Sequence, residues 1–228
     1  MTSAIILSMQ PGQAMQRDEI RYEMLQAADV EGMIDLIARA FSAGDPPAVA
    51  MRLSAAELRA FLEPLALRAL EDGLTIVART ANGKLAGALL SDDFAAAQPI
   101  DAGQLSPGFL PILALLDALD EQYRSGREIA KGQYLHLFML AVDAAYGGRG
   151  IAQGLVNCCL ENGARHGYQW VVTEATGVVS QRVFGKLGFE ERLRIFYQQF
   201  TYNGNTVFAS ISGPSGVALM DKSLAGLP

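Results

Sequence analysis

Residues 134–152, which read YLHLFMLAVDAAYGGRGIA, have the types and spacing that chemistry would need. Residues 134–142 are large and apolar apart from His136, and turn residues bound them, so we predict a buried strand. The glycine-rich residues 147–150 then lead into apolar residues at helical spacing. Glycines at a strand-to-helix turn let the backbone approach a ligand, and the first helical N–H groups point outward at the positive end of the helix. The pattern predicts a phosphate or pyrophosphate site.

Two glycine-rich phosphate motifs can be compared with this turn. A P-loop requires a Lys and a Ser or Thr after its last glycine, and the sequence has neither. A dinucleotide-binding turn requires G-x-G-x-x-G, and here Gly148 and Gly150 are followed by Gln153 in place of the third glycine. Glu174 nevertheless lies at about the right distance for a ribose-binding acid. A nicotinamide-dependent oxidoreductase is therefore one alternative.

A third pattern fits better. A strand, a glycine-rich turn, a helix, another strand and a short helix ending in KLGF at 186–189 together resemble the GNAT superfamily of N-acetyltransferases. That family holds the pyrophosphate of acetyl-CoA with [QR]-x-x-G-x-[GA]. Gly150 and Ala152 fill the last two defined positions, and Gly147 falls where Gln or Arg is usual. The resemblance covers roughly residues 20–223.

The resemblance implies an α/β protein with a single mixed, mostly antiparallel sheet flanked by helices, and acetyl-CoA as cosubstrate. Backbone N–H groups of the central strand would contact the pantetheine and the thioester carbonyl, and those of the glycine turn would hold the pyrophosphate. A side chain such as Arg149 would add a charge-assisted phosphate contact, unless it is simply solvated. The cofactor-binding residues implied in this way are Leu140, Ala141, Val142, Gly147, Gly148, Arg149, Gly150, Ile151, Ala152, Ser180 and Phe184.

The resemblance also implies catalytic residues. The usual general acid of the family is a Tyr on the late helix, but its position is Phe184 here, which cannot donate a proton. The chain is more similar to the arylalkylamine branch, especially the insect dopamine N-acetyltransferases. In that comparison the acid of an acid-Pro segment falls on Asp45, and two serines of the site fall on Ser180 and Thr176. We expect these three side chains to serve proton transfer.

Each of these residues also has a structural explanation. Asp45 precedes two prolines and fits a turn. Ser180 and Thr176 lie where a helix begins, so either can be a capping residue. Glu174, at the end of a predicted strand, is a further candidate base. These alternatives stay open at the level of sequence.

His136 is the one polar residue in the predicted central strand. It matches one of two histidines that vertebrate arylalkylamine acetyltransferases place there, and the other falls on Phe138. Because alternate strand residues share a face, we expect His136 on the same face as Phe138, Leu140 and Val142. Its side chain is either a base or water relay, or a buried core histidine with satisfied hydrogen bonds.

Length and composition indicate which kinds of protein this chain can be. With 228 residues, half of them hydrophobic, the chain can bury a sizeable core as one domain. A net charge of −6 argues against a nucleic-acid partner and is compatible with a cationic amine. No apolar run approaches the ~20 residues that span a membrane. The two cysteines, Cys158 and Cys159, are adjacent and suit packing in a reducing compartment. We expect a cytoplasmic protein with no membrane partner and no metal ion.

The chain divides simply. Residues 1–18 are expected to form a flexible tail, and 19–228 one acetyltransferase domain. An insertion at about 92–132 contains a helical pattern, which either packs on the sheet or forms a lid over the substrate site. The predicted order is βααββ, the insertion, then βαβαβββ. Its last strands are placed at 189–202, 206–211 and 217–220.

The predicted function is acetyl transfer from acetyl-CoA to a primary amine by direct attack in a ternary complex. We expect a small-molecule acceptor such as an arylalkylamine or a polyamine, and a monomer or homodimer. A module that binds acyl-CoA without turnover is the other alternative, because Phe184 replaces the usual acid. Aromatic residues available to hold the acceptor are Phe41, Phe109, Phe184, Phe196 and Tyr197.

Overall fold

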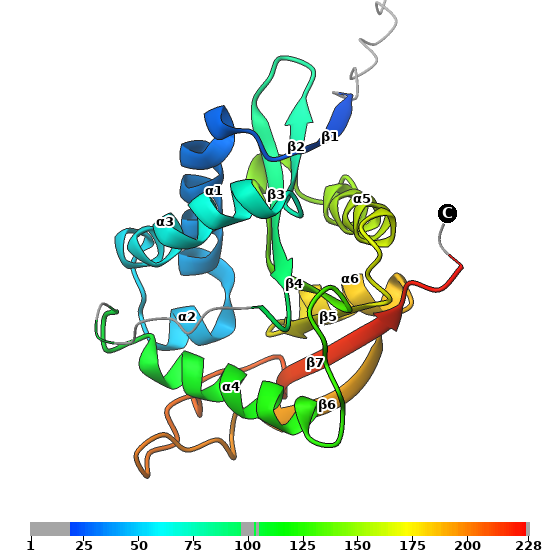
Figure 1. Ribbon diagram of the computed structural model, residues 1–228. Coiled ribbons are helices and arrows are strands. Elements are labelled where there is room, and N and C mark those ends of the chain that lie inside the picture. The colour runs from blue at the N-terminus through cyan, green and yellow to red at the C-terminus, as the bar shows by residue number, and fades with distance from the viewer. Residues whose placement is uncertain (1–18, 97–102, 104, 227–228) are drawn as a thin grey trace, which may run out of the picture.

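The computed structural model describes residues 19–96, 103 and 105–226, so the predicted tail at 1–18 lies outside the described residues. Figure 1 shows helices packed around one twisted sheet. The strands are β1 (Ile20–Met24), β2 (Ile76–Thr80), β3 (Leu85–Asp93), β4 (Tyr134–Val142), β5 (Trp170–Ala175), β6 (Glu190–Phe196) and β7 (Gly216–Ser223). The helices are α1 (Val30–Gly44), α2 (Pro46–Ala50), α3 (Ala55–Asp72), α4 (Leu110–Arg124), α5 (Ile151–Arg165) and α6 (Val178–Lys186), with short 3-10 turns at Ala27–Asp29 and Ala144–Tyr146.

The sheet has the strand order β1-β2-β3-β4-β5-β7-β6. Every neighbouring pair is antiparallel except β4 and β5, which are parallel because the crossover helix α5 joins them. The predicted mixed, mostly antiparallel sheet is confirmed. A doubly wound dinucleotide-binding sheet is parallel, so the oxidoreductase alternative does not fit this fold.

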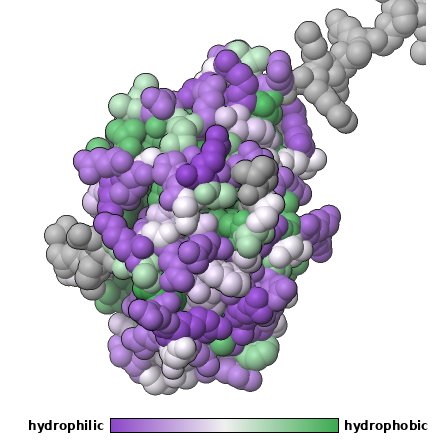
Figure 2. Space-filling model, turned by 45° about the vertical axis from the view of Figure 1, so that its right-hand side comes forward, coloured by the Kyte–Doolittle hydropathy of each residue, from purple (hydrophilic) through white to green (hydrophobic). Residues whose placement is uncertain are grey.

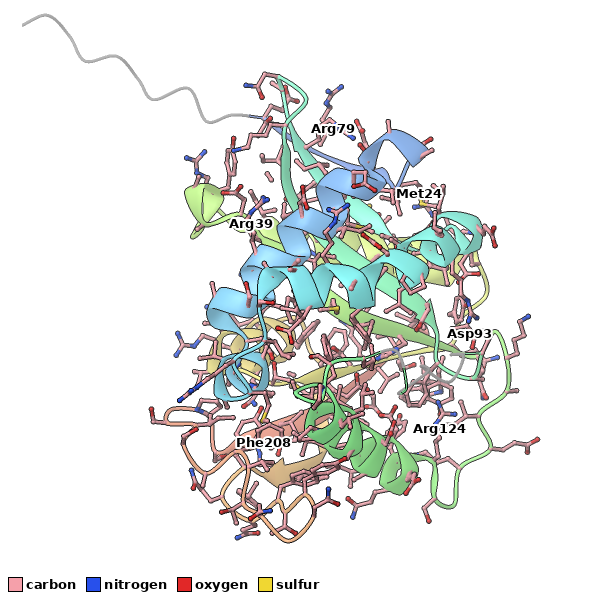
Figure 3. The ribbon with its side chains drawn as sticks, turned by 90° about the vertical axis from the view of Figure 1, so that its left-hand side faces the viewer. Met24, Arg39, Arg79, Asp93, Arg124 and Phe208 are labelled. Atoms are coloured by element: carbon pink, nitrogen blue, oxygen red, sulfur yellow. The ribbon has the colours of Figure 1, made fainter. Side chains whose placement is uncertain are left out.

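Helices cover both faces of the sheet (Figures 1 and 3). On one face, α1 and α3 pack against each other and against β3 and β4, burying Ile37 and Leu62 completely. On the other face, α5 packs against β2, β3 and β4 through Leu155 and Cys159. The α3 helix begins at a capping box, in which Ser54 and Glu57 exchange hydrogen bonds as their spacing predicts.

The helix predicted inside the insertion is α4. It packs against β6 and β7, and its first turn contains Pro111. The Tyr123 hydroxyl donates to Asp221 Oδ2 on β7 at 2.7 Å, which fixes the end of the helix to the sheet. The insertion begins later than predicted, because β3 continues to Asp93, whose partner on β4 is Leu135.

Near the C-terminus one predicted strand is too long and another is wrong. The strand predicted at 189–202 ends at Phe196, and residues 206–211 form consecutive turns instead of a strand. The reason is packing: Phe208 is fully buried, with its ring centroid 5.9 Å from that of Tyr197 and 5.7 Å from that of Phe200. The segment folds locally over β6 and β7, as Figure 3 shows for Phe208, and leaves β7 to pair with β5.

The central strand contains a bulge that the alternation rule missed. Leu90 of β3 pairs with Met139 and the next residue pairs with Leu137, so Phe138 has no partner on β3. Phe138 and Met139 both pack toward α1 and α3, whereas Leu140 packs toward α5. The prediction that His136 shares a face with Leu140 and Val142 is therefore wrong, because the extra residue reverses the alternation.

Polar residues cover much of the surface seen in Figure 2, with apolar patches between them. Within the described part of the chain, no helix is both long enough and apolar enough to cross a membrane. Cys159 is buried beside Ser91, whose oxygen lies 3.2 Å from its sulfur, and burial raises the pKa of this thiol to about 12. Both cysteines are free thiols in packed positions.

The β6–β7 hairpin depends on one glycine. A Cβ atom at Gly216 would lie 2.1 Å from the carbonyl oxygen of Ile195, and backbone cannot move away as a side chain can. We predict that Gly216→Ala lowers the free energy of unfolding by about 1–3 kcal/mol, measured by urea denaturation. The control is Gly185→Ala on exposed α6, where nothing lies within 4 Å of the new atom. That change should raise stability by up to about 1 kcal/mol, and equal effects of the two variants would contradict the prediction.

Candidate active site

The site begins where two parallel strands separate. β4 and β5 are paired over only three residues, from Tyr134 and Trp170 to His136 and Val172. The last contact is a hydrogen bond of 2.8 Å from Thr173 Oγ1 to the carbonyl oxygen of Leu137. Beyond it, residues 138–142 of β4 pair with no strand of the described chain on the side facing β5. The backbone donors on that side are available to a ligand.

A cleft opens at this separation, and its space, with the solvent at its mouth included, is about 1280 Å³. Its floor is the end of β4 and the start of α5, and its walls come from α1, the residues before α2, and α6. Gly148 and Gly150 have φ values of +72° and +81°, which place them in the left-handed region and turn the chain into α5. The residues of the predicted cofactor site that line the cleft are Leu140, Ala141, Val142, Gly147, Gly148, Gly150, Ile151, Ala152 and Ser180.

Positive charge lies beside this cleft. The ring of Tyr146, which lines the cleft, has the Arg149 guanidinium 5.2 Å and the Lys84 ammonium 5.3 Å from its centroid. Arg149 itself is not among the lining residues, so its predicted phosphate contact stays a prediction. The α5 helix begins here with its positive end directed at the cleft, which suits an anionic group.

A second pocket lies between α1, α3 and α4 and the separated strands, and its space, with solvent at its opening included, is about 820 Å³. Its walls are mainly apolar, and five of its lining residues are Phe41, Phe61, Phe109, Phe138 and Phe184. Phe61 and Phe109 stack with their ring centroids 5.0 Å apart. Phe184, predicted to touch the cofactor, lines this pocket and not the cleft. Of the predicted aromatic set, Phe196 and Tyr197 line neither.

The cleft and the pocket meet at a small group of residues. Those lining both are Phe41, Asp45, Leu140, Thr176 and Ser180. Asp45 caps α2, because its Oδ2 accepts from the backbone N–H of Ala48 at 3.0 Å. Its Oδ1 accepts from the Thr176 hydroxyl at 2.5 Å. The structure therefore brings together three of the predicted catalytic residues from segments far apart in the chain.

Two opposing effects act on the pKa of Asp45. Burial raises the pKa of this carboxyl above its ordinary value, and the hydrogen bonds from Thr176 and Ala48 oppose the rise. Thr176 is itself held in place, since its carbonyl oxygen accepts from the Tyr197 hydroxyl at 2.7 Å. A carboxylate with a raised pKa is a stronger base than an exposed one.

Ser180 has local partners. Its Oγ donates to the carbonyl oxygen of Gly177 at 2.9 Å and accepts from the N–H of the same residue at 3.1 Å, so it caps α6. The structural explanation from sequence therefore holds, and the hydroxyl also faces both the cleft and the pocket. Thr176 does not cap the helix; it bonds to Asp45.

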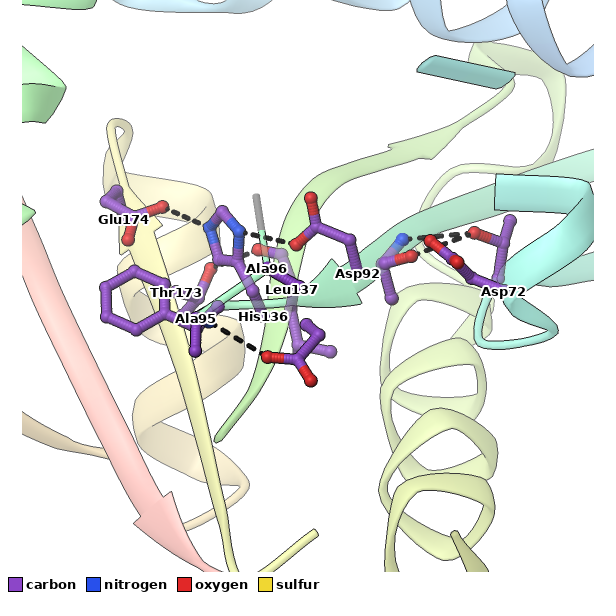
Figure 4. Close-up of polar contacts among 12 residues, drawn as sticks. Asp72, Asp92, Ala95, Ala96, His136, Leu137, Thr173 and Glu174 are labelled. Atoms are coloured by element: carbon purple, nitrogen blue, oxygen red, sulfur yellow. Dashed lines mark hydrogen bonds and ion pairs between the residues drawn. The ribbon is translucent and has the colours of Figure 1, made fainter. Parts of the chain in front are cut away.

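His136 lies behind the pocket and lines neither cavity. Figure 4 shows its ring between two carboxylates: Nδ1 lies 2.9 Å from Asp92 Oδ1, and Nε2 lies 2.8 Å from Glu174 Oε2. Burial alone would lower the pKa of His136, but the charges of Glu174 and Asp92 raise it well above its ordinary value. Glu174 is the member of this group that lines the pocket.

Sequence reasoning missed two acids of this cluster. Asp92 was placed at the start of the insertion, but the extension of β3 puts it opposite His136. Asp120 of α4 contacts Glu174. No local signal marks Asp92, because its role depends on strand register. Asp120 interrupts an otherwise apolar helix face, which is the one signal that the sequence offers.

Residues 40–189 match the Acetyltransferase (GNAT) family. The chain belongs to the GNAT family of acetyltransferases. Acetyl-CoA is the acetyl donor of that family, and the nicotinamide alternative is set aside. The matched segment contains the separated strands, the glycine turn, α5 and α6, so the family assignment and the cleft concern the same part of the molecule.

Several solved structures share the fold. The C-terminal condensation domain of Ebony, in complex with beta-alanyl-dopamine, has a TM-score of 0.84 at 14% identity, over 90% of this chain and 99% of that one. Arylalkylamine N-acetyltransferase 2 from Aedes aegypti has a TM-score of 0.77 at 23% identity, and the match covers 91% of this chain and 100% of that one. A polyamine N-acetyltransferase of Drosophila melanogaster has a TM-score of 0.70 at 19% identity, and the match covers 90% of this chain and 100% of that one. At these identities the likeness establishes a common fold.

The glycine turn yields a test of cofactor binding. A side chain at Gly150 would strain a left-handed backbone by about 1–2 kcal/mol. If binding requires the tight turn, Gly150→Ala should raise the Kd for acetyl-CoA about 5- to 30-fold, measured by calorimetry. The control is Gly167→Ala, at the far end of α5, where φ is +87° and the new atom also meets nothing within 4 Å. This variant should lose stability but keep its affinity, and equal losses of affinity would contradict the prediction.

Proposed function

We propose that this acetyltransferase moves the acetyl group of acetyl-CoA to a primary amine of a small molecule, by direct attack in a ternary complex. The observation that carries the proposal is the junction of the two cavities. The cleft and the pocket share the Asp45–Thr176 pair and Ser180. A donor in the cleft and an acceptor in the pocket would therefore meet beside a buried carboxylate, as direct transfer requires.

The pocket supports an amine with an apolar or aromatic body. Its walls include phenylalanine rings from α1, α3, β4 and α6, together with aliphatic residues of α4. A polyamine would need carboxylates along its length, and the second acid of the pocket, Glu174, is engaged by His136. We therefore favour an arylalkylamine, with polyamines second. The structures that share the fold include arylalkylamine, agmatine and polyamine acetyltransferases, so they support a small amine without ordering the two classes.

Asp45 is the proposed general base. An ammonium acceptor must lose a proton before it attacks, and Asp45 lies where donor and acceptor meet. Its raised pKa brings it closer to that of an amine, which assists proton transfer. Glu174 is the other carboxylate of the pocket, but its Oε2 already pairs with His136 at 2.8 Å. We therefore assign the base to Asp45, with His136 and Glu174 behind it.

The acyl group needs two further contacts. The backbone N–H groups of Leu140 and Val142 face the side of β4 that borders the cleft and lacks a strand partner among the described residues, and one of them would stabilise the developing oxyanion. The leaving thiolate needs a proton, and the Ser180 hydroxyl is the proposed donor. This hydroxyl would give up the hydrogen bond that it donates to the carbonyl oxygen of Gly177 and donate instead to the thiolate sulfur of CoA.

The first experiment asks for turnover. Purified protein with acetyl-CoA should release CoA with phenethylamine, tyramine or tryptamine, and more slowly with putrescine or spermidine, as measured with a thiol reagent. We predict that Asp45→Asn lowers kcat/KM about 10²-fold or more, the usual effect of losing a general base. Asn keeps the helix cap, so the variant should fold.

The control is Asp35→Asn, which removes an exposed α1 carboxylate that pairs with Arg59. It should keep full activity, and calorimetry should give all three proteins a similar Kd for acetyl-CoA. Binding of acetyl-CoA without CoA release from any amine would sink the proposal. A module that binds acyl-CoA without turnover would replace it.

Thr176 gives a prediction about pH. Its hydroxyl is among the groups that lower the pKa of Asp45, so Thr176→Val should raise that pKa further. Because the base acts as the carboxylate, the acid limb of the kcat/KM profile should move to higher pH in the variant. Rates at high pH, where Asp45 is ionised in both proteins, should converge. An unchanged acid limb would show that a different group sets it.

A further inference from the structure

One face of α4 carries both the pocket wall and an acid. Leu113 and Leu116 line the acceptor pocket, and Asp120 follows Leu116 by four residues. Residues three and four apart lie on the same side of a helix, so Asp120 continues the wall that the two leucines form. The face of α4 that lines the pocket with two leucines therefore also carries the carboxyl group of Asp120.

Asp120 contacts Glu174 of β5, which is itself 95% buried at its side chain and lines the same pocket. Oε2 of Glu174 pairs with His136. Oδ1 of Asp120 and Oε1 of Glu174 are both buried, and among the described residues neither has a hydrogen-bond partner when both groups are carboxylates. A single proton between the two acids satisfies both oxygens, since a protonated carboxyl donates and a carboxylate accepts.

The surrounding charges fit this arrangement. Asp120 faces Glu174 of β5, His136 of β4 and Arg124 of its own helix. His136 is in turn paired with Asp92 of β3. On β7 and β6, which also pack against α4, Asp221 is paired with Arg192 at 2.7 Å and accepts from Tyr123. Arg124, labelled at the end of α4 in Figure 3, donates to the carbonyl oxygen of Phe94.

We propose that Asp120 is a positioning residue for the acceptor: as a carboxylic acid it donates to Glu174 and so fixes α4, with Leu113 and Leu116, against the acceptor pocket. This rests on the proposed function, since it assigns the pocket to the amine. Asp120 lines neither cavity and acts through Glu174. The contact joins α4 to β5, which ends at Ala175, one residue before Thr176.

The protonation of Asp120 sets the pH at which this contact holds. Burial, followed by the charge of Glu174 and the hydrogen bond between the two acids, raises the pKa of Asp120 to about 8, although His136 and Arg124 oppose the rise. The unfolded chain loses this proton near pH 4. The folded protein is therefore stabilised below that pH, loses this stability as pH rises to about 8, and then loses no more. Above pH 8 the carboxylates of Asp120 and Glu174 face each other and repel.

The test compares wild type with Asp120→Asn, whose amide donates to Glu174 at every pH. The probe acceptor is phenethylamine, or the best amine of the panel, at pH 7 and pH 9. At pH 7 the acceptor KM of the two proteins should agree within twofold. At pH 9 the wild-type KM should be at least threefold higher than that of the variant. Taking the ratio at one pH cancels the titration of the amine. The KM for acetyl-CoA should not change in either protein.

A second measurement does not depend on turnover. The Tm of wild type minus that of Asp120→Asn should fall from pH 6 to pH 9. The matched control Glu121→Gln, which neutralises the exposed neighbour on α4, should instead follow wild type. A difference in Tm independent of pH would overturn the shared proton. A pH-dependent Tm with a constant KM ratio would overturn the positioning role. Absence of turnover with every amine would count against the proposed function, while the Tm comparison would still decide the proton.

Discussion

The separation of β4 from β5 is the constraint on which the rest of the structure depends. Three paired residues hold the strands together at one end, and Thr173 closes the pairing with a bond to Leu137. The bulge at Phe138 follows immediately and turns two consecutive side chains toward α1 and α3. Because the strands part here, one cleft can use the backbone of β4 while a pocket uses the side chains of both strands. A regular ladder would fill this space with hydrogen bonds between strands.

The two halves of the site differ in what recognises the ligand. The cleft, the proposed cofactor site, relies on backbone: the glycine turn, the N-terminus of α5 and the edge of β4. The pocket, the proposed acceptor site, relies on side chains that include those of α1, α3 and α4, which reach it from remote parts of the chain. A backbone site requires particular residues at fixed local spacing, such as Gly148 and Gly150. A side-chain site requires only suitable volume and polarity, which many sequences can supply.

This difference explains what the sequence could predict. The sheet class, the α4 helix and the glycine turn follow from local patterns, and each is found. The bulge at Phe138 could not be predicted, because no residue type demands it and the run from 134 to 142 reads as an ordinary strand. Because of the bulge, the side chain of Leu140 lies on the opposite face of the sheet from that of His136. The turns at 206–211 were missed for a similar reason, because the burial of Phe208 against Tyr197 outweighs a strand-like sequence.

The buried acids show how one pocket can keep two carboxylates in different roles. Asp45 is held by neutral donors, the Thr176 hydroxyl and the Ala48 N–H. No cationic group in the described part of the chain lowers its pKa, and burial makes it more basic. Glu174 instead lies beside a histidine whose pKa the neighbouring acids raise, so its charge is balanced before any ligand arrives. The first environment suits a group that takes a proton from an ammonium. The second suits a group that holds the wall of the pocket, because its carboxylate is already paired with His136.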